Sequence, residues 1–303
     1  MRTVIGAVGR VLVTVGLLIL LFVAYQLWGT GIYEARAQSD LESQFDRDLA
    51  RQDSPRTTTT TSGTTPATTT PIELPPTPAA GDPVGVITID KIGVDKVVVE
   101  GTTVPDLRRA PGHYEGSAMP GQLGNAAIAG HRTTYGAPFG DLDQLVRGDT
   151  LSVRTLRGTW EYEVLPDYPI AVKPSQTEVL DPTIDEATGQ PLATLTLTTC
   201  EPKYQATERL VVKAQLSDTN RQSPLPASDQ RTELVLDTGL SGGSESRAPV
   251  FLWGLIAAVI GGLWWLLFHR YARWTAWVAG AIPFLVVLFV FYSNLERVLP
   301  NNY

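Results

Sequence analysis

The chain has few of the residues that usually staple a small extracellular domain together or bind a metal ion. Its 303 residues include one cysteine, Cys200, and three histidines. One cysteine excludes an internal disulfide, and a lone thiol is either buried and inert or chemically used. No metal-ligand cluster is visible, and the acidic residues lack the spacing of an EF-hand loop. We therefore expect no metal ion and no other cofactor.

An excess of positive charge is also missing. The formal net charge is -7 and the isoelectric point is about 5.1. Nucleic-acid-binding domains usually carry a basic patch, and none appears in this sequence. We expect no nucleic-acid partner.

Long apolar runs, by contrast, are present near both ends of the chain. The run over residues 11–28 is long enough to cross a bilayer, and so are the runs over 249–268 and 274–292. A cleavable signal peptide is the alternative for the first run. No small-x-small cleavage site follows at once, so we predict an uncleaved anchor. The sequence thus predicts one N-terminal and two C-terminal transmembrane helices.

The distribution of positive charge predicts the orientation of these helices. Arg2 and Arg10 place residues 1–10 in the cytoplasm, and the short basic loop 269–273 belongs there too. The long segment between the helices and the tail 293–303 are then extracellular. We predict a multi-pass protein of the cell membrane, in which the C-terminal pair of helices is a second anchor.

Two polar segments separate the membrane helices from the middle of the chain. Residues 29–83 are first charged and then rich in Thr and Pro. The charged part forms a juxtamembrane helix or stays disordered, and the Thr/Pro-rich part cannot bury enough surface to fold. We predict an extracellular stalk over 29–83. Residues 217–248 form a second polar linker.

The middle of the chain, residues 84–216, is predicted to be an all-β domain. Short β-rich runs cover 84–89, 94–99, 125–129, 150–156 and 160–165, and the last two form a hairpin around the Arg157-Gly158 turn. Residues 138–145 favour one or two helical turns that begin with Pro138. Many short strands with few helices predict a sandwich or a closed barrel.

The cysteine ends an alternating run of leucines and threonines. This pattern over residues 194–200 predicts a half-buried strand with Cys200 on its polar face. Pro202 stops the strand, because it lacks a donor N–H. A second alternating run begins at Arg209. Two strands joined in this way return antiparallel, which places Cys200 and Arg209 near the same end and off the core face.

Three separated segments resemble the signature of the sortase family, cysteine transpeptidases on the outer face of Gram-positive membranes. Residues 196–200, Thr-Leu-Thr-Thr-Cys, are followed a short loop later by Arg209. Residues 129–139, Ala-Gly-His-Arg-Thr-Thr-Tyr-Gly-Ala-Pro-Phe, are similar to the family's catalytic-histidine segment. Cys-Glu-Pro-Lys-Tyr over 200–204 and Gly-His-Tyr over 112–114 look most like class E, the actinobacterial housekeeping type. The resemblance implies an eight-stranded sortase-type barrel over 84–216.

The resemblance also implies the roles of five residues. Cys200 is the expected nucleophile, His131 the proton carrier, and Arg209 the group that stabilises the oxyanion or holds the substrate carbonyl. Tyr114 is predicted to line the substrate groove, with ordinary packing as the alternative. Thr199 is predicted to make a hydrogen bond in the groove. His113, in a loop-like stretch, is expected to be structural or to support the residues that contact the substrate.

The implied reaction is a two-step acyl transfer. The cysteine attacks the Thr–Gly bond of an LAxTG- or LPxTG-type signal at the C-terminus of a secreted protein. An amine of a peptidoglycan precursor, of the lipid II type, then resolves the thioester. The implied partners are therefore secreted proteins that bear sorting signals, the precursor, and the membrane.

Three alternatives remain beside this interpretation. The first is a class C-like sortase that polymerises pilins; such enzymes usually carry a lid with Asp-Pro-aromatic. Here Asp82-Pro83 is followed by Val84, and no aromatic residue stands in 71–86, which predicts an open groove. The others are a catalytically silent sortase-like membrane scaffold and a thiol hydrolase. Residues 236–239, Leu-Asp-Thr-Gly, look like a sorting signal but lack Pro or Ala after Leu, and we interpret them as chance.

Overall fold

The structure is a computed structural model that describes residues 2–53, 78–218, 224–226, 240, 246–268 and 274–296. Several predicted segments lie outside the described residues. These are most of the Thr/Pro-rich part of the stalk (54–77), the predicted cytoplasmic loop 269–273, the tail from 297 onward and most of the linker 217–248.

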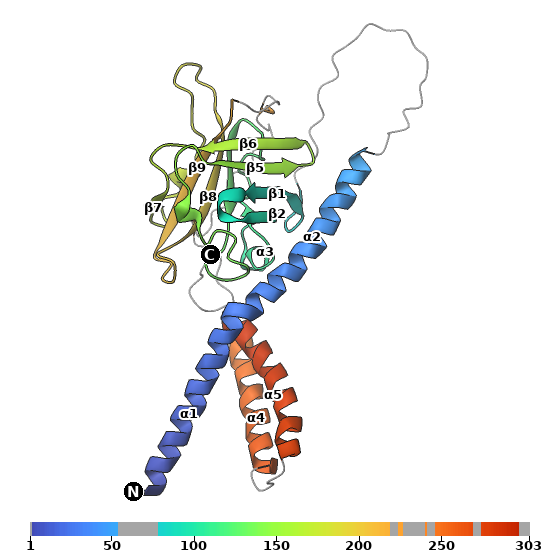
Figure 1. The fold of residues 1–303 in the computed structure, drawn as a ribbon, viewed down its shortest axis with the longest axis vertical. Coiled ribbons are helices and arrows are strands. Elements are labelled where there is room, and N and C mark those ends of the chain that lie inside the picture. Colours follow the sequence, from blue (N-terminus) through green and yellow to red (C-terminus); the bar gives the residue numbers. More distant parts are fainter. Residues whose placement is uncertain are drawn as a thin grey trace.

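Eight strands of the described region close into a barrel. Their hydrogen-bonded order is β6-β5-β1-β2-β3-β4-β8-β9, and a further pairing of β6 with β9 joins the two ends (Figure 1). β7 pairs with the first residues of β9. The predicted eight-stranded, all-β barrel is therefore confirmed. The strands are β1 (Pro83–Ile89), β2 (Val94–Glu100), β3 (Gly112–His113), β4 (Gly124–Ala129), β5 (Thr150–Thr155), β6 (Gly158–Val164), β7 (Ile170–Val172), β8 (Ala193–Glu201) and β9 (Glu208–Leu216).

The strands agree closely with the runs predicted from the sequence. The predicted hairpin is formed by β5 and β6, with Thr155 opposite Gly158. β3 and β7 were not predicted, because two or three residues are too few to show a period-2 pattern. The predicted helical turn over 138–145 is reduced to a 3-10 turn, η3 (Leu142–Gln144). A further short helix, α3 (Val104–Leu107), links β2 to β3.

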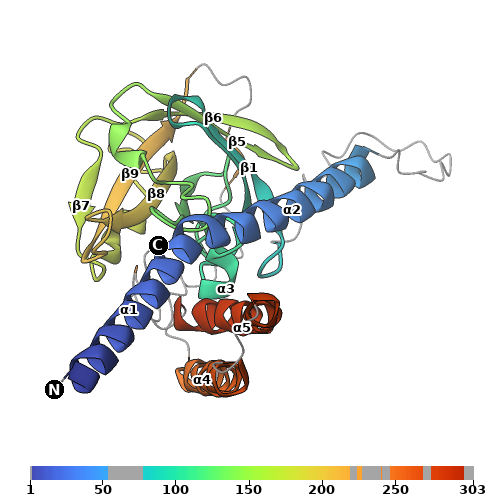
Figure 2. The same ribbon diagram turned by 60° about the horizontal axis from the view of Figure 1, so that its bottom comes forward.

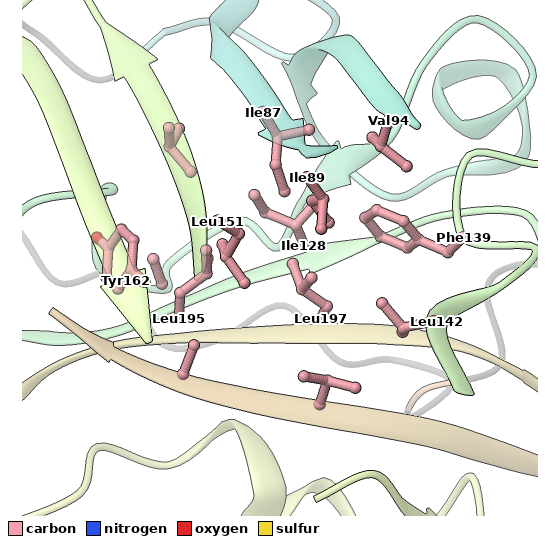
Figure 3. Packing of buried hydrophobic residues seen from close by; sticks show 14 of the residues in the cluster. Ile87, Ile89, Val94, Ile128, Phe139, Leu142, Leu151, Tyr162, Leu195 and Leu197 are labelled. Carbon is pink, nitrogen blue, oxygen red and sulfur yellow. The ribbon is translucent and has the colours of Figure 1, made fainter. Parts of the chain in front are cut away.

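The barrel interior is filled by apolar side chains from almost every strand. Leu195 and Leu197 of β8 meet Ile87, Ile89 and Ile128 there (Figure 3). Phe139 and Leu142 enter the same core from the segment after β4, and both are fully buried (Figure 3). This burial anchors the segment that carries His131, since it fixes a point eight residues farther along the chain.

The N-terminal region is a long helical rod. It consists of α1 (Arg2–Ala24), a π-helical turn η1 (Tyr25–Gly29) and α2 (Thr30–Asp53). Of the two alternatives for the charged segment, the structure therefore contains the helix. Leu41 of α2 is buried against Val97 and Val99 of β2, and Phe45, one turn farther on, is buried with the Arg154 guanidinium 5.3 Å from its ring. This half of the rod thus lies along the barrel instead of standing free of it (Figure 1).

Two more helices, α4 (Ala248–Phe268) and α5 (Trp274–Leu295), lie side by side (Figure 2). Glycines allow their close approach: the Trp264 ring packs where a Cβ on Gly280 would stand, 2.1 Å away. The pair also touches the N-terminal rod, since the Tyr292 hydroxyl donates to the Leu18 carbonyl at 2.6 Å. By length and composition, the N-terminal helix and α4 are each apolar enough to cross a membrane. α1 and the α4–α5 pair extend from the same end of the barrel (Figure 1).

Candidate functional site

Strand register pairs two of the predicted site residues and directs the chain that carries the third towards them. Cys200 of β8 stands directly opposite Arg209 of β9, which agrees with the predicted antiparallel return that brings both residues near the same end. β4 pairs parallel with β8, with Ala129 beside Thr198. If this register continued for two residues beyond the end of β4, His131 would lie beside Cys200. The backbone follows it at least one step, because the Gly130 N–H donates to the Thr198 carbonyl at 3.1 Å.

Cys200 lies on the outer face of the barrel. Leu195 and Leu197 point into the core, and side chains alternate along a strand, so Cys200 points the other way. The thiol is nevertheless only 2% exposed, because other segments cover this face. Burial raises the pKa of the Cys200 thiol to about 11, although the positive charges of Arg209 and Arg132 act to lower it.

His131 begins a tight loop after β4. The loop closes where the Phe139 N–H donates to the His131 carbonyl at 3.1 Å. The imidazole Nδ1 lies 3.2 Å from the Thr134 hydroxyl, and its ring centre lies 4.9 Å from that of Tyr135. Packing behind the loop is dense, since a Cβ on Gly130 would stand 2.6 Å from the Phe139 ring. The structure thus gives the imidazole neighbours within its own loop.

Arg209 is buried, with 2% of its surface exposed. It is therefore not an ordinary exposed residue at a strand end, which was the alternative interpretation. Its Nε donates to the Leu240 carbonyl at 2.8 Å, and its Nη1 donates to the carbonyls of Ala206 and Glu208 at 3.2 and 3.0 Å. A guanidinium in this position holds main-chain carbonyls by directed, charge-assisted hydrogen bonds.

Leu240, from the polar segment after the barrel, fills the face beside Arg209. The side chain is fully buried, and its N–H donates to the Pro174 carbonyl at 2.9 Å. It belongs to an apolar cluster on the outer face of the barrel with Leu107, Tyr114, Ala127, Ala129, Val172, Leu180 and Val211. Nothing in the local sequence predicted this contact. The sorting-signal-like residues 236–239 precede it but lie outside the described residues.

Tyr114 and Thr199 both lie close to the cysteine strand, in different ways. The Tyr114 hydroxyl is 3.0 Å from the Thr198 hydroxyl, and burial raises the pKa of this phenol to about 12. Its ring packs in the Leu240 cluster, on the same face as Cys200. The Thr199 hydroxyl donates to the Gly130 carbonyl at 2.8 Å, and the side chain is fully buried. It therefore joins β8 to the start of the His131 loop; substrate contact stays a prediction for both residues.

Arg132 was not predicted as a site residue. Its Nη1 donates to the Cys200 carbonyl at 2.8 Å and forms an ion pair with Glu201, and its Nη2 lies 3.3 Å from Asp143. The side chain is 4% exposed. Arg132 thus ties the histidine loop to the backbone of the cysteine. Its place directly after His131, in the segment that resembles a family motif, was the available signal.

His113 has a structural environment, as expected. Its Nδ1 lies 2.9 Å from the Glu100 carboxylate, and its Nε2 contacts the Ala118 carbonyl and the Ser117 hydroxyl. Burial acts to lower the pKa of this imidazole, but the hydrogen bond and charge of Glu100 outweigh it, so the pKa is raised. Within the part of the chain that the structure describes, no group of three or more His, Cys, Asp or Glu side chains is arranged to hold a metal ion.

Comparison with known proteins identifies the family. A family model described as the sortase domain matches residues 87–217, almost the whole barrel. Sortase SrtE2 of Streptomyces coelicolor is 29% identical over 236 residues, which cover 72% of this chain and 83% of that protein. The barrel domain, residues 87–217, belongs to the sortase family. Sortases are cysteine transpeptidases, and the relatives that match here support the resemblance to class E.

Two further sortases illustrate how much of each chain is shared. Sortase SrtE1 of Streptomyces coelicolor is 29% identical over 215 residues, which cover 68% of this chain and 55% of that protein. The chain thus spans about half the length of this curated relative. The solved structure of sortase E from Streptomyces avermitilis is 38% identical, covers 46% of this chain and 90% of that chain, and has a TM-score of 0.40.

Proposed function

We propose that this sortase is a membrane-anchored transpeptidase in which Cys200 is the nucleophile, His131 the proton carrier and Arg209 the carbonyl clamp. The observation that supports the proposal is the register of the strands: Cys200 stands directly opposite Arg209, and His131 follows two residues after Ala129, which pairs with Thr198. A nucleophile, a base and a fixed cation at one site are the groups that acyl transfer requires.

In the first step the Cys200 Sγ attacks the carbonyl carbon of the scissile peptide bond. The raised thiol pKa keeps the sulfur protonated at neutral pH, so the proton passes to His131 as the C–S bond forms. The carbonyl oxygen becomes an oxyanion, which the Arg209 N–H groups stabilise. The C–N bond then breaks, His131 gives its proton to the leaving amine, and a thioester remains on Cys200.

In the second step an acceptor amine attacks the thioester carbonyl. His131 takes a proton from the attacking nitrogen, Arg209 again stabilises the oxyanion, and the C–S bond breaks. The thiolate regains the proton from His131, so the enzyme ends as it began. One peptide bond has been exchanged for another, and no oxidant or metal ion is consumed.

The support for Arg209 as a carbonyl clamp comes from its present partner. Its Nε already donates to a main-chain carbonyl, that of Leu240, at 2.8 Å. A substrate peptide in the same place would present the same group. The clamp is therefore built for an extended peptide with its carbonyl turned towards β9.

We infer the substrate class from the resemblance to class E. The proposed donor is a secreted protein with an LAxTG- or LPxTG-type signal, cleaved between Thr and Gly. The proposed acceptor is a peptidoglycan-precursor amine of the lipid II type. The proposed topology puts the N-terminus in the cytoplasm and the barrel outside, so that enzyme and both substrates share one membrane surface. Such sharing raises their effective concentration.

The class C-like alternative predicts a lid over the cysteine. Of the residues before the barrel, 78–82 are described, and they lie beside β2: the Gly81 N–H donates to the Glu100 carbonyl at 2.7 Å. The Glu100 N–H in turn donates to the Asp82 carbonyl at 2.9 Å. Residues 78–82 thus lie along β2, whereas 71–77 lie outside the described residues, so the open groove and the housekeeping role stay proposals.

The test is transfer of a sorting-signal peptide by the full-length protein in detergent or nanodiscs. We expect cleavage between Thr and Gly, a thioester adduct on Cys200 in the mass spectrum, and a new amide only when an amine acceptor is present. Cys200→Ala should abolish both cleavage and adduct, and Arg209→Lys should lower the rate at least about a hundredfold. Release of free acid at the same rate with and without the amine would instead identify a hydrolase. Wall attachment by Cys200→Ala would support the silent scaffold.

A further inference from the structure

The loop that carries His131 has an unusual backbone. Three consecutive residues have positive φ: Tyr135 (φ 50), Gly136 (φ 72) and Ala137 (φ 44). Residues other than glycine rarely adopt this region, and a bulky side chain there is an outlier. Such a conformation persists only where surrounding contacts impose it, and it is often found at functional sites. Hydrogen bonds within the loop contribute to this conformation, and further contacts come from the juxtamembrane helix α2.

Thr30, the first residue of α2, holds the backbone of the loop. The Tyr135 N–H donates to the Thr30 hydroxyl oxygen at 3.3 Å. The hydroxyl uses its single proton on the Gln26 carbonyl, at 2.8 Å, and so offers a lone pair to Tyr135. Thr30 is 2% exposed and follows directly on the π-helical turn η1. π-helical turns are rare in proteins, and those that occur are often found at functional sites.

Glu34, one turn farther along α2, holds the next residue of the loop. Its carboxylate lies so close to Gly136 that a Cβ there would stand 2.6 Å from Oε2. The Glu34 side chain is 3% exposed and forms a 2.8 Å ion pair with Lys96 of β2. The Glu34 carboxylate thus packs directly against the loop, and the loop backbone at Gly136 has no space to move towards α2.

The side chain of Tyr135 transmits this position to the imidazole. Its ring lies 4.9 Å from the His131 ring, centre to centre. Its hydroxyl accepts a hydrogen bond from the Arg108 Nε, and the Arg108 guanidinium stands over the rings of both Tyr135 and Tyr33, at 5.2 and 5.5 Å. Tyr33 also belongs to α2. The backbone N–H and the hydroxyl of Tyr135 are therefore both held by hydrogen bonds, and its ring limits the positions that the His131 ring can take.

We propose that α2 is part of the catalytic apparatus, with Thr30 as a positioning residue that holds Tyr135 against His131. This inference rests on the proposed role of His131 as proton carrier. It makes the segment between membrane and barrel more than a spacer, because the proton carrier of the barrel is set by the helix that leaves the membrane. Removal of the Thr30 hydroxyl should therefore change chemistry while substrate binding is kept.

The test compares Thr30→Val with Thr30→Ser in the full-length protein. Valine keeps the shape of threonine but offers no acceptor to the Tyr135 N–H, whereas serine keeps the hydroxyl. We expect Thr30→Val to lower kcat for peptide transfer about ten- to hundredfold, with KM within about twofold, since a small displacement of a catalytic group has effects of this size. Thr30→Ser should restore most of kcat. Thr30→Ala, which cannot overpack, takes the place of the valine variant if the latter does not fold.

A second position on α2 provides the matched control. Gln38 makes three hydrogen bonds to the barrel, with the Val97 N–H, the Val97 carbonyl and the Arg109 carbonyl, at 2.8, 3.1 and 3.3 Å. None of these three partners belongs to the His131 loop. Gln38→Leu should lower Tm at least as much as Thr30→Val but keep kcat within about twofold, because it removes only general docking of the helix.

The outcomes separate this inference from the proposed function. A folded Thr30→Val protein with unchanged kcat, or a Gln38→Leu protein that loses kcat equally, overturns the positioning role. If Cys200→Ala or His131→Ala kept transfer activity, the proposed function itself would fail, whatever Thr30 does. Loss of activity in those two variants together with full activity in Thr30→Val would leave the function intact and reject only the role of α2.

Discussion

Leu240 gives the sharpest prediction for how this sortase meets its substrate. The side chain is fully buried, and its carbonyl occupies the Arg209 Nε that the proposed mechanism needs for a substrate carbonyl. A peptide carbonyl that takes the hydrogen bond from the Arg209 Nε must therefore displace Leu240 first. The apparent affinity for such a peptide is reduced by the fraction of molecules in which the site is open.

The size of the effect follows from the buried carbon atoms. Leu240→Ala removes three carbons from a fully buried side chain, at up to about 0.8 kcal/mol each, so roughly 1.4–2.4 kcal/mol of the displacement cost is lost. The main-chain hydrogen bond to Arg209 is kept. Because about 1.4 kcal/mol is a factor of ten, we expect KM for a sorting-signal peptide to fall about ten- to sixtyfold. kcat should stay near the wild-type value, since Leu240 has already left the site during chemistry.

A second leucine of the same polar segment supplies the control. Leu225 is also docked on the barrel: its N–H donates to the Gly121 carbonyl, and its carbonyl accepts from the Leu123 N–H, both at 2.8 Å. These contacts lie before the start of β4, whereas His131 follows the end of that strand. Leu225→Ala should leave KM unchanged. An unchanged or raised KM in Leu240→Ala would refute the reasoning, and a raised value would mean that Leu240 helps to build the substrate site.

Two further predictions concern the thiol and the histidine loop. The chain has a single cysteine, so alkylation by iodoacetamide reports Cys200 alone. The alkylation rate should keep rising up to about pH 11, because burial raises the thiol pKa to about 11. The rate for an unstructured cysteine peptide, the control, should level off near pH 8.5. The same shift should cost the fold stability as pH rises from about 8.5 to 11, where the unfolded thiol ionises first; a plateau in alkylation near neutral pH would contradict both statements. Gly136→Ala should lower both Tm and transfer activity more than Gly93→Ala. Both glycines have positive φ, 72 and 66, so the backbone strain of an alanine is similar at the two positions. A Cβ at Gly136, however, would stand 2.6 Å from the Glu34 carboxylate, whereas a Cβ at Gly93 would meet nothing within 4 Å. Equal losses of Tm in the two variants would show that backbone strain alone matters and that α2 exerts no pressure on the loop.

The parts of the site that could be predicted are those encoded by neighbouring residues. Alternation of leucine and threonine placed Cys200 off the core face, and the turn after Pro202 placed Arg209 opposite it. Both inferences need only the period of a strand and the direction of a hairpin. The level of His131 needed the resemblance to a family, because a parallel pairing of β4 with β8 has no local signature in the sequence.

The contacts that could not be predicted join segments that are distant in the chain. Thr30 and Tyr135 are 105 positions apart, and Arg209 and Leu240 are 31 apart. One leucine in a polar stretch shows no periodicity, so composition indicated a linker and nothing more. For α2 a signal existed, since Leu41 and Phe45 have the i, i+4 spacing of one helix face. The many charges around them favoured a solvated helix or disorder instead of a helix docked on a barrel.

These distant contacts change how the resting cysteine should behave. Outside the cell, where we propose the barrel to lie, a thiolate is the form that oxidation attacks first. In this structure the Cys200 thiol is 2% exposed, and burial raises its pKa. On the same outer face, beside Arg209, lies the apolar cluster that includes Leu240, a residue from outside the barrel. We therefore expect the thiol to stay protonated until a peptide enters the site, whereas Leu240 limits access to the Arg209 Nε.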